Sequence, residues 1–327
     1  MAMIETTNLT KRYGDLVALN NLNLMINEGD CFGFIGPNGA GKTTTIKILA
    51  TLLKPSSGQA TVAGLTVGFQ NRQIRPLIGY VPDFMGAYED MVVQEYLEFF
   101  AAAYNIHGQQ RKKVVADVLE LTDLTYKATA EVNSLSRGMQ QRLSVARVLL
   151  HDPKVLLMDE PASGLDPRAR IEMRELLKEL RRMGKTILIS SHILPELAEL
   201  CNVVGIIERG QLVFSGGVDE IVKRARMGHV LHVGVADRTA DAMTLLQKLP
   251  GVKKTALADN DDASAQQKKP GSVAPKIIHL TYDDSAGHSF TDIPNILVNQ
   301  GFRITKFSEE PVNLETAFMR LTKGLVQ

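Results

Sequence analysis

Apolar residues in the first two-thirds of the chain follow two different periodicities. Alternating apolar and polar positions predict strands over residues 3–9 and 16–26. Uninterrupted apolar runs at Cys31–Ile35 and at residues 155–158 predict parallel strands that are covered on both faces. Shorter apolar runs predict further strands at residues 60–62, 78–81 and 186–190. Helical periodicity predicts helices at residues 45–53, 92–105, 111–121, 137–150 and 168–183.

The helices predicted between the strands differ in what they bury. Those within residues 88–150 form a helical insert, and their apolar residues group on one face. The residues expected to face the core there are Tyr96, Leu97, Phe99, Phe100, Tyr104, Val114, Val115, Val118 and Leu119. The alternation of strands and helices along the chain predicts an open α/β sheet.

The pattern starts again in the last third of the chain. Strands at residues 229–235, 252–257, 276–282 and 302–307 and helices at 240–249 and 293–299 give the order βαββαβ. That order predicts a small α+β module of the ferredoxin-like type. Residues 258–275 are polar and predict a mobile loop, and a terminal helix is expected at residues 313–323. We therefore expect two domains, residues 1–222 and 223–327.

One glycine-rich stretch lies between the strand Cys31–Ile35 and a predicted helix. Its residues are Gly36, Pro37, Asn38, Gly39, Ala40, Gly41, Lys42, Thr43 and Thr44. Glycines let the backbone N–H groups approach a phosphate, and the following helix N-terminus favours an anion. In this pattern Lys42 reaches the β- and γ-phosphates of a nucleotide, and the Thr43 hydroxyl is a ligand for Mg²⁺. The alternative is a glycine-rich turn with a solvated lysine, which the flanking strand and helix disfavour.

Further polar residues follow the ends of the buried strands. Asp159 and Glu160 come directly after the run 155–158, where two adjacent carboxylates are costly unless they meet a cation or a reacting group. Beside a phosphate loop, Asp159 fits a ligand of Mg²⁺, and Glu160 is placed to orient or deprotonate a water. His192 follows the strand at 186–190 and is either a γ-phosphate contact or a solvent-facing loop residue.

Two other positions carry weaker signals. Ser136 suits the N-cap of the helix that follows it, and with Gly138 it marks a second helix N-terminus that favours an anion. Tyr13 lies in a turn, where it is either a shelf on which a base stacks or a structural residue.

Composition limits the possible functions. The chain has 327 residues, with 37 Lys and Arg against 36 Asp and Glu, so its net charge gives no argument for nucleic acid. Only two cysteines occur, Cys31 and Cys201, which predicts a reducing compartment and no disulfide framework. No apolar run is long enough for a membrane helix and none has signal-peptide character, so we expect no direct membrane insertion.

Taken together and in this order, these motifs resemble the ATP-binding cassette ATPases, the nucleotide-binding subunits of ABC transporters. Tyr13 matches the aromatic residue that stacks on adenine, and residues 36–44 match the phosphate loop. The stretch LSRGM at residues 135–139, here called the signature stretch, resembles the family's Leu-Ser-Gly-Gly-Gln. Asp159 and Glu160 match the magnesium aspartate and the catalytic glutamate, and His192 matches the switch histidine. The resemblance covers residues 3–222, and the last third is similar to the C-terminal domain of drug, antibiotic and polysaccharide exporters.

The resemblance implies a P-loop NTPase cassette with a β-rich N-terminal subdomain. It implies ATP and Mg²⁺ as ligands, and a second copy of the chain whose Ser136 and Gly138 complete each site. It also implies a membrane-spanning permease subunit, which would hold this chain at the cytoplasmic side of the membrane. Lys42, Glu160 and His192 would carry the hydrolysis.

Two places depart from the family pattern. Asp83 stands where a glutamine usually follows the mid-domain strand, and it is either in the metal's ligand shell or a surface charge that meets the permease. Arg137 and Met139 replace the third and fifth residues of the signature stretch. Two rival functions remain: a soluble cassette ATPase that acts on ribosomes or DNA, and a module that uses ATP only to dimerise. A P-loop kinase explains the signature stretch and His192 less well.

Overall fold

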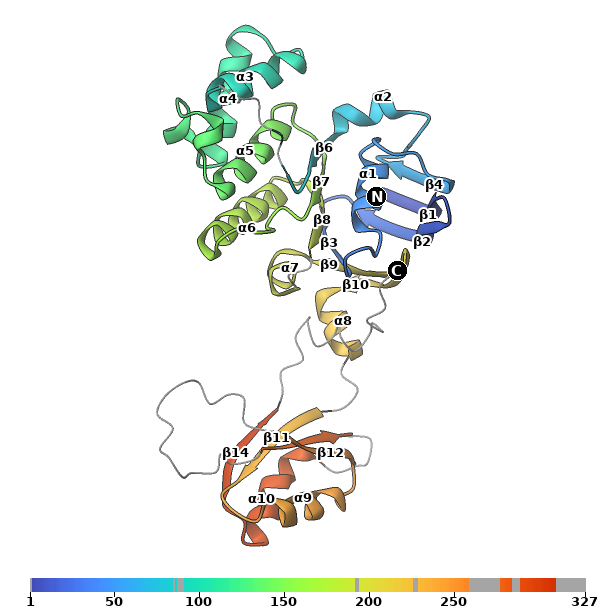
Figure 1. Cartoon of the computed structure of the whole chain (residues 1–327), viewed down its shortest axis with the longest axis vertical. Helices are drawn as coiled ribbons and strands as arrows, with labels where there is room; N and C mark the ends of the chain where they lie inside the picture. The colour runs from blue at the N-terminus through green and yellow to red at the C-terminus, as the bar shows by residue number, and fades with distance from the viewer. Residues whose placement is uncertain are drawn as a thin grey trace. The chain divides into compact units, whose positions relative to one another are not determined.

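The computed structural model describes residues 2–84, 86, 91–191, 194–225, 229–258, 277–283 and 289–309. The chain divides into two compact units between Ile221 and Val222 (Figure 1). His192, the predicted loop at 258–275 apart from its first residue, and the predicted terminal helix at 313–323 lie outside the described residues.

A six-stranded sheet forms the centre of the first unit. Its strands lie in the order β10 (Gln211–Gly217), β9 (Val203–Glu208), β3 (Cys31–Ile35), β8 (Thr186–Ser191), β7 (Val155–Asp159) and β6 (Ile78–Val81). All neighbouring pairs are parallel except β9 with β10. Every residue of β3, β7 and β8 is buried, as expected for strands covered on both faces. The predicted open α/β sheet is therefore confirmed.

A second, antiparallel sheet in this unit has the order β2 (Leu16–Asn27), β1 (Ala2–Tyr13), β4 (Ser57–Val62) and β5 (Leu65–Thr66). The buried apolar residues of helix α1 (Lys42–Leu49) form part of the apolar core beneath this sheet. The helix begins three residues before the predicted range of 45–53 and ends four residues before the end of that range. Ala50 caps it, and Thr51 takes the left-handed φ of 62°, which ends helical hydrogen bonding.

In the described part of the predicted insert, the α-helices are α3 (Val93–Ala103), α4 (Gly108–Leu121) and α5 (Arg137–Leu149). Figure 1 shows them gathered on the side of the six-stranded sheet away from β1, β2 and β4. Tyr96 and Leu97 are fully buried as predicted, but Phe99 is 49% and Tyr104 40% exposed. The core placement of these two aromatics was wrong: Phe99 lies beside the one stripe that this 11-residue helix buries, and Tyr104 is the C-cap, beyond the last residue of the helix.

The remaining helices of this unit connect the strands. They are α2 (Asn71–Ile74), α6 (Pro167–Arg182), α7 (Leu194–Leu200) and α8 (Val218–Ala225), the last of which crosses the unit boundary. No helix in the described part of the chain is both long and apolar enough to cross a membrane.

The second unit has the predicted order βαββαβ. Its antiparallel sheet runs β12 (Val252–Ala258), β13 (Ile277–Tyr282), β11 (His229–Val235) and β14 (Ile304–Glu309). Helices α9 (Thr239–Gln247) and α10 (Ile293–Asn299) cover one face of it (Figure 1). Leu231, Val233, Ile278, Leu280 and Leu297 are fully buried between the sheet and these helices. This is a ferredoxin-like arrangement.

Candidate functional site

The glycine-rich stretch forms the loop between β3 and α1. Gly41 has a φ of 108° and Gly39 a φ of 80°, a region that other residues rarely adopt. A Cβ at Gly41 would lie 2.6 Å from Leu19 Cδ2, and one at Gly36 would collide with the backbone oxygen of Ile207. Gly39 faces open space. Packing therefore requires glycine at positions 36 and 41. Gly39 lets the loop take a left-handed turn without a side chain that would cover its open side.

Lys42 begins helix α1 and is only 6% exposed. Its ammonium nitrogen Nζ donates hydrogen bonds to the carbonyl oxygens of Gly36 at 2.6 Å and Pro37 at 3.3 Å. It also lies 3.6 Å from Glu160 Oε1. Burial lowers the pKa of Lys42, and the neighbouring Glu160 carboxylate opposes that shift. The loop thus surrounds the lysine with oxygen atoms, the surroundings that phosphate oxygens would also provide.

Asp159 and Glu160 lie at the C-terminal end of β7, next to the end of β8. Asp159 is 5% exposed, and its Oδ1 accepts hydrogen bonds from Thr43 Oγ1 at 3.1 Å and Ser190 Oγ at 2.8 Å. The backbone N–H of Glu160 donates to Ser190 Oγ at 3.0 Å, and Glu160 has a left-handed φ of 50°. Ser190 therefore orients both carboxylate residues.

Sequence reasoning placed Ser190 in a strand but gave it no role. A signal existed: a hydroxyl at the end of an otherwise apolar buried strand needs a partner. Only the strand order supplies that partner, because β8 pairs with β7 and aligns Ser190 with Asp159.

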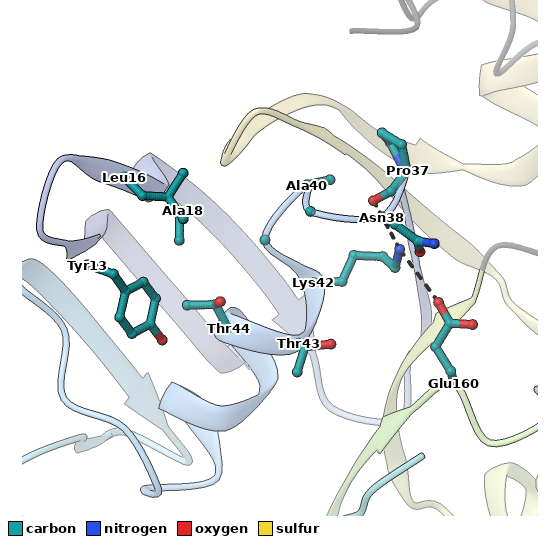
Figure 2. Close-up of a pocket in the computed structure, with 12 residues that line it drawn as sticks. Tyr13, Leu16, Ala18, Pro37, Asn38, Ala40, Lys42, Thr43, Thr44 and Glu160 are labelled. Carbon is teal, nitrogen blue, oxygen red and sulfur yellow. Dashed lines mark hydrogen bonds and ion pairs between the residues drawn. The ribbon is translucent and has the colours of Figure 1, made fainter. Parts of the chain in front are cut away.

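A cleft of about 240 Å³ extends along the loop. It is lined by Tyr13, Leu16, Ala18, Pro37, Asn38, Gly39, Ala40, Gly41, Lys42, Thr43, Thr44 and Glu160. Figure 2 shows the Tyr13 ring toward one end and Glu160 toward the other, with Lys42 between them. Tyr13 is 48% exposed, and Lys11 Nζ lies 5.1 Å from the centroid of its ring. A planar group could stack on this ring while an anion lies over the loop.

The residues present fit a magnesium ion as well as a phosphate group. The Thr43 hydroxyl and the Asp159 carboxylate are hard oxygen donors, which Mg²⁺ prefers. Both hydrogen bonds to Asp159 are at Oδ1, and no described residue hydrogen-bonds to its Oδ2. One carboxylate oxygen is thus left for a cation.

Ser136 and Gly138 lie in a different hollow. Ser136 caps α5 as predicted, and its Oγ accepts a hydrogen bond from Met139 N at 3.3 Å. Both residues line a hollow of about 340 Å³ together with Asp166 and Ala169. None of the residues that line this hollow also lines the cleft of Lys42 and Glu160. Within one chain, the signature stretch and the phosphate loop therefore form two separate surfaces.

Asp83 follows β6, the edge strand beside β7, and its side chain is exposed. It does not line the cleft. Tyr80, on β6, has a raised pKa, first because of burial and then because of the charges of Asp159 and Asp83. The structure thus brings Asp83 to the same edge of the sheet as Asp159, without a described contact between them. His192 comes directly after Ser191, the last residue of β8, in the sequence, but it lies outside the described residues.

Comparisons with known proteins agree with this geometry. A model of the ABC transporter family matches residues 19–163. Nod factor export ATP-binding protein I of Burkholderia pseudomallei (strain 1710b) is 33% identical over 322 residues, which cover 98% of this chain and 97% of that protein. Bacitracin transport ATP-binding protein BcrA of Bacillus licheniformis is 41% identical over 225 residues, 68% of this chain and 72% of that protein.

A solved structure extends the comparison to three dimensions. It is a dimeric ATP-binding cassette in a post-hydrolysis state, bound to ADP and Pi. It is 27% identical, has a TM-score of 0.59, and its match covers 66% of this chain and 98% of that chain. The fold, the phosphate loop and the similarity over nearly the full length of a relative lead to one conclusion: the chain belongs to the ABC transporter family, as an ATP-binding subunit.

Proposed function

We propose that this chain hydrolyses ATP and that the hydrolysis powers export through a separate membrane-spanning partner. The names of the two relatives support export, since one serves Nod factor export and the other bacitracin transport. The chain would work at the cytoplasmic side of the membrane, held there by the permease. The identity of the exported molecule would be decided by that partner.

The observation that carries the proposal is the grouping of Lys42, Thr43, Asp159 and Glu160 at one edge of the sheet. Lys42 would exchange its carbonyl contacts for β- and γ-phosphate oxygens of ATP. Glu160, released from Lys42, would orient a water in line with the γ-phosphate and accept its proton. Thr43 and Asp159 would hold Mg²⁺, which when bound would neutralise charge on the phosphates.

Two copies of the chain would form each complete site. Lys42 and Glu160 line one cleft while Ser136 and Gly138 line another hollow, so one chain supplies two different half-sites. In a head-to-tail pair, the α5 N-terminus of one copy would face the γ-phosphate bound by the other. His192 would contact the same phosphate. The dimeric arrangement of the solved cassette supports this pairing.

Two experiments test the proposal. The purified protein should hydrolyse ATP with Mg²⁺, and Lys42→Ala should lose this activity because the loop then lacks its cation. Absence of turnover in the wild-type protein, with ATP-dependent dimerisation intact, would favour the rival reading as a dimerisation module. Affinity purification from detergent-solubilised membranes should recover a protein with membrane-spanning helices, whereas recovery of ribosomes or DNA would contradict the export role.

A further inference from the structure

Arg137 is the residue at which the signature stretch departs most in chemistry from the family pattern. It is the first residue of α5, directly after the cap Ser136, and its side chain is exposed. Its guanidinium lies against the backbone of Gly164. A Cβ at Gly164 would come 2.6 Å from Arg137 Cζ and 3.0 Å from Nη2. Arg137 therefore touches the loop at residues 163–166, which connects β7 and Glu160 to helix α6.

This contact is a packing contact and no ion pair. No hydrogen bond or ion pair to the Arg137 guanidinium is formed by the residues that the structure describes. A planar guanidinium can cover a glycine backbone closely, since there is no side chain between them. Gly164 has a φ of 65°, so a residue with a Cβ would be strained there even without Arg137.

The loop that Arg137 covers is connected to Glu160 by a short path. Ser163 N donates a hydrogen bond to the Glu160 carbonyl oxygen at 3.0 Å, so residues 160–163 form one turn. At the other end of the loop, Asp166 caps α6 by accepting from Arg168 N and Ala169 N, both at 3.0 Å. A displacement of Gly164 would therefore be carried along this turn to Glu160.

The helix that carries Arg137 is itself closely packed. A Cβ at Gly138 would lie 2.6 Å from Ala169 Cβ, which shows that the α5 N-terminus rests directly on the first turn of α6. The N-termini of α5 and α6 are thus packed against each other. The loop between Glu160 and Asp166 is not part of this packing. Arg137 reaches across to it.

We propose that Arg137 is a positioning residue that couples the two half-sites of a single subunit. It would hold the loop at 163–166 so that a phosphate at Ser136, bound by the partner copy, fixes Glu160 in the subunit's own cleft. The proposal rests on the proposed function, because it needs two copies that share two ATP molecules. It assigns a role to a residue that the hydrolytic mechanism leaves without one.

The test compares three variants of Arg137 in steady-state ATP hydrolysis. Arg137→Ala should lower kcat at least about tenfold, since small displacements of a catalytic group are costly, and bring the Hill coefficient toward one. ATP binding by the isolated subunit should stay unchanged. Arg137→Gln keeps a planar group on a long stem and should retain most of the cooperativity, whereas Arg137→Lys keeps the charge but loses the plane. Arg182→Ala, an exposed arginine at the end of α6, is the matched control.

Gly164→Ala gives an independent check of the same contact. It should push the guanidinium away and, because the left-handed φ of 65° also strains the alanine, lower kcat at least as far as Arg137→Ala does; the double variant should be no worse than Gly164→Ala alone. Additive losses would contradict the coupling. Full cooperativity in Arg137→Ala would also contradict it. So would activity retained in Arg137→Lys but lost in Arg137→Gln, because the charge and not the planar group would then be the important feature. If wild-type protein neither hydrolyses ATP nor dimerises, the proposed function itself is wrong, and this outcome is distinct from the others.

Discussion

Ser190→Ala removes the hydroxyl that holds both carboxylate residues of the site. Ser190 Oγ donates to Asp159 at 2.8 Å and accepts from Glu160 N at 3.0 Å. Asp159 is buried and, among the described residues, would keep only the hydrogen bond from Thr43. Glu160 N would keep its hydrogen bond to the Ser190 carbonyl oxygen at 3.2 Å. A hydrogen bond to a charged group contributes about 1.5–3 kcal/mol. We expect Ser190→Ala to lower the free energy of unfolding of the cassette by about that amount.

The matched control is Ser144→Ala in α5. Ser144 is also fully buried, but its Oγ has no hydrogen-bond partner in the described part of the chain. Removal of this hydroxyl should be neutral or slightly stabilising, because it relieves an unsatisfied polar group. Both substitutions delete the same atom from a buried serine, so their difference reports the hydrogen bonds of Ser190.

The measurement is urea unfolding without nucleotide or metal, followed by far-ultraviolet circular dichroism, since the chain contains no tryptophan. Hydrogen exchange of the β7 and β8 amides reports on the cassette alone, without a contribution from the second unit. Ser190→Ala should lose protection in these two strands. If the free energies of unfolding of Ser190→Ala and Ser144→Ala differ by less than about 0.5 kcal/mol, the hydrogen bonds of Ser190 do not stabilise the cassette as proposed.

Three further predictions follow from other residues. Ser136→Arg should abolish cooperative hydrolysis yet bind ATP as a monomer, and mixing it with Lys42→Ala should restore one complete site per heterodimer; full activity in monomeric protein would contradict the shared site. Asp83→Asn should leave basal hydrolysis unchanged and impair transport in the assembled complex. If instead the isolated subunit needed a higher Mg²⁺ concentration for hydrolysis, Asp83 would belong to the ligand shell of the metal. Burial lowers the pKa of His151 below its usual 6.5 although its Nε2 lies 2.9 Å from the Ile78 carbonyl oxygen, so the unfolded chain binds the proton more tightly. Stability should therefore be complete above pH 6.5 and fall as the pH is lowered through that value, and His151→Gln should flatten this slope in unfolding measurements.

The sequence predicted those parts of the molecule that depend on local pattern. The strand Cys31–Ile35, the loop at residues 36–41 and the Ser136 cap follow from residue types and spacing alone. The role of Ser190 does not, because it depends on β8 lying beside β7. The exposure of Phe99 depends on how wide a stripe of α3 is covered, and that of Tyr104 on where the helix ends; periodicity shows neither. The end of α1 is decided at Thr51, whose left-handed φ is unusual for a β-branched residue and has no sequence signal.

The separation of the two half-sites has a similar origin. Ser136 and Lys42 lie at the starts of two different helices. The spacing of residues along the chain therefore does not predict which surface of the cassette each of them reaches. Packing of α5 on α6 fixes the first, and the six-stranded sheet fixes the second. The resemblance implies a site shared by two copies, and this stays a prediction; within one chain, no residue lines both surfaces.

The most direct test of hydrolysis by paired cassettes is the variant Glu160→Gln. The change keeps the shape of the side chain and removes its basic oxygen, so turnover should fall roughly a hundredfold or more. ATP should still bind, and because it is not hydrolysed, the protein should accumulate as an ATP-bound dimer. Size-exclusion chromatography with light scattering detects this dimer. Turnover close to that of the wild-type protein, or a variant that stays monomeric with ATP bound, would contradict the account.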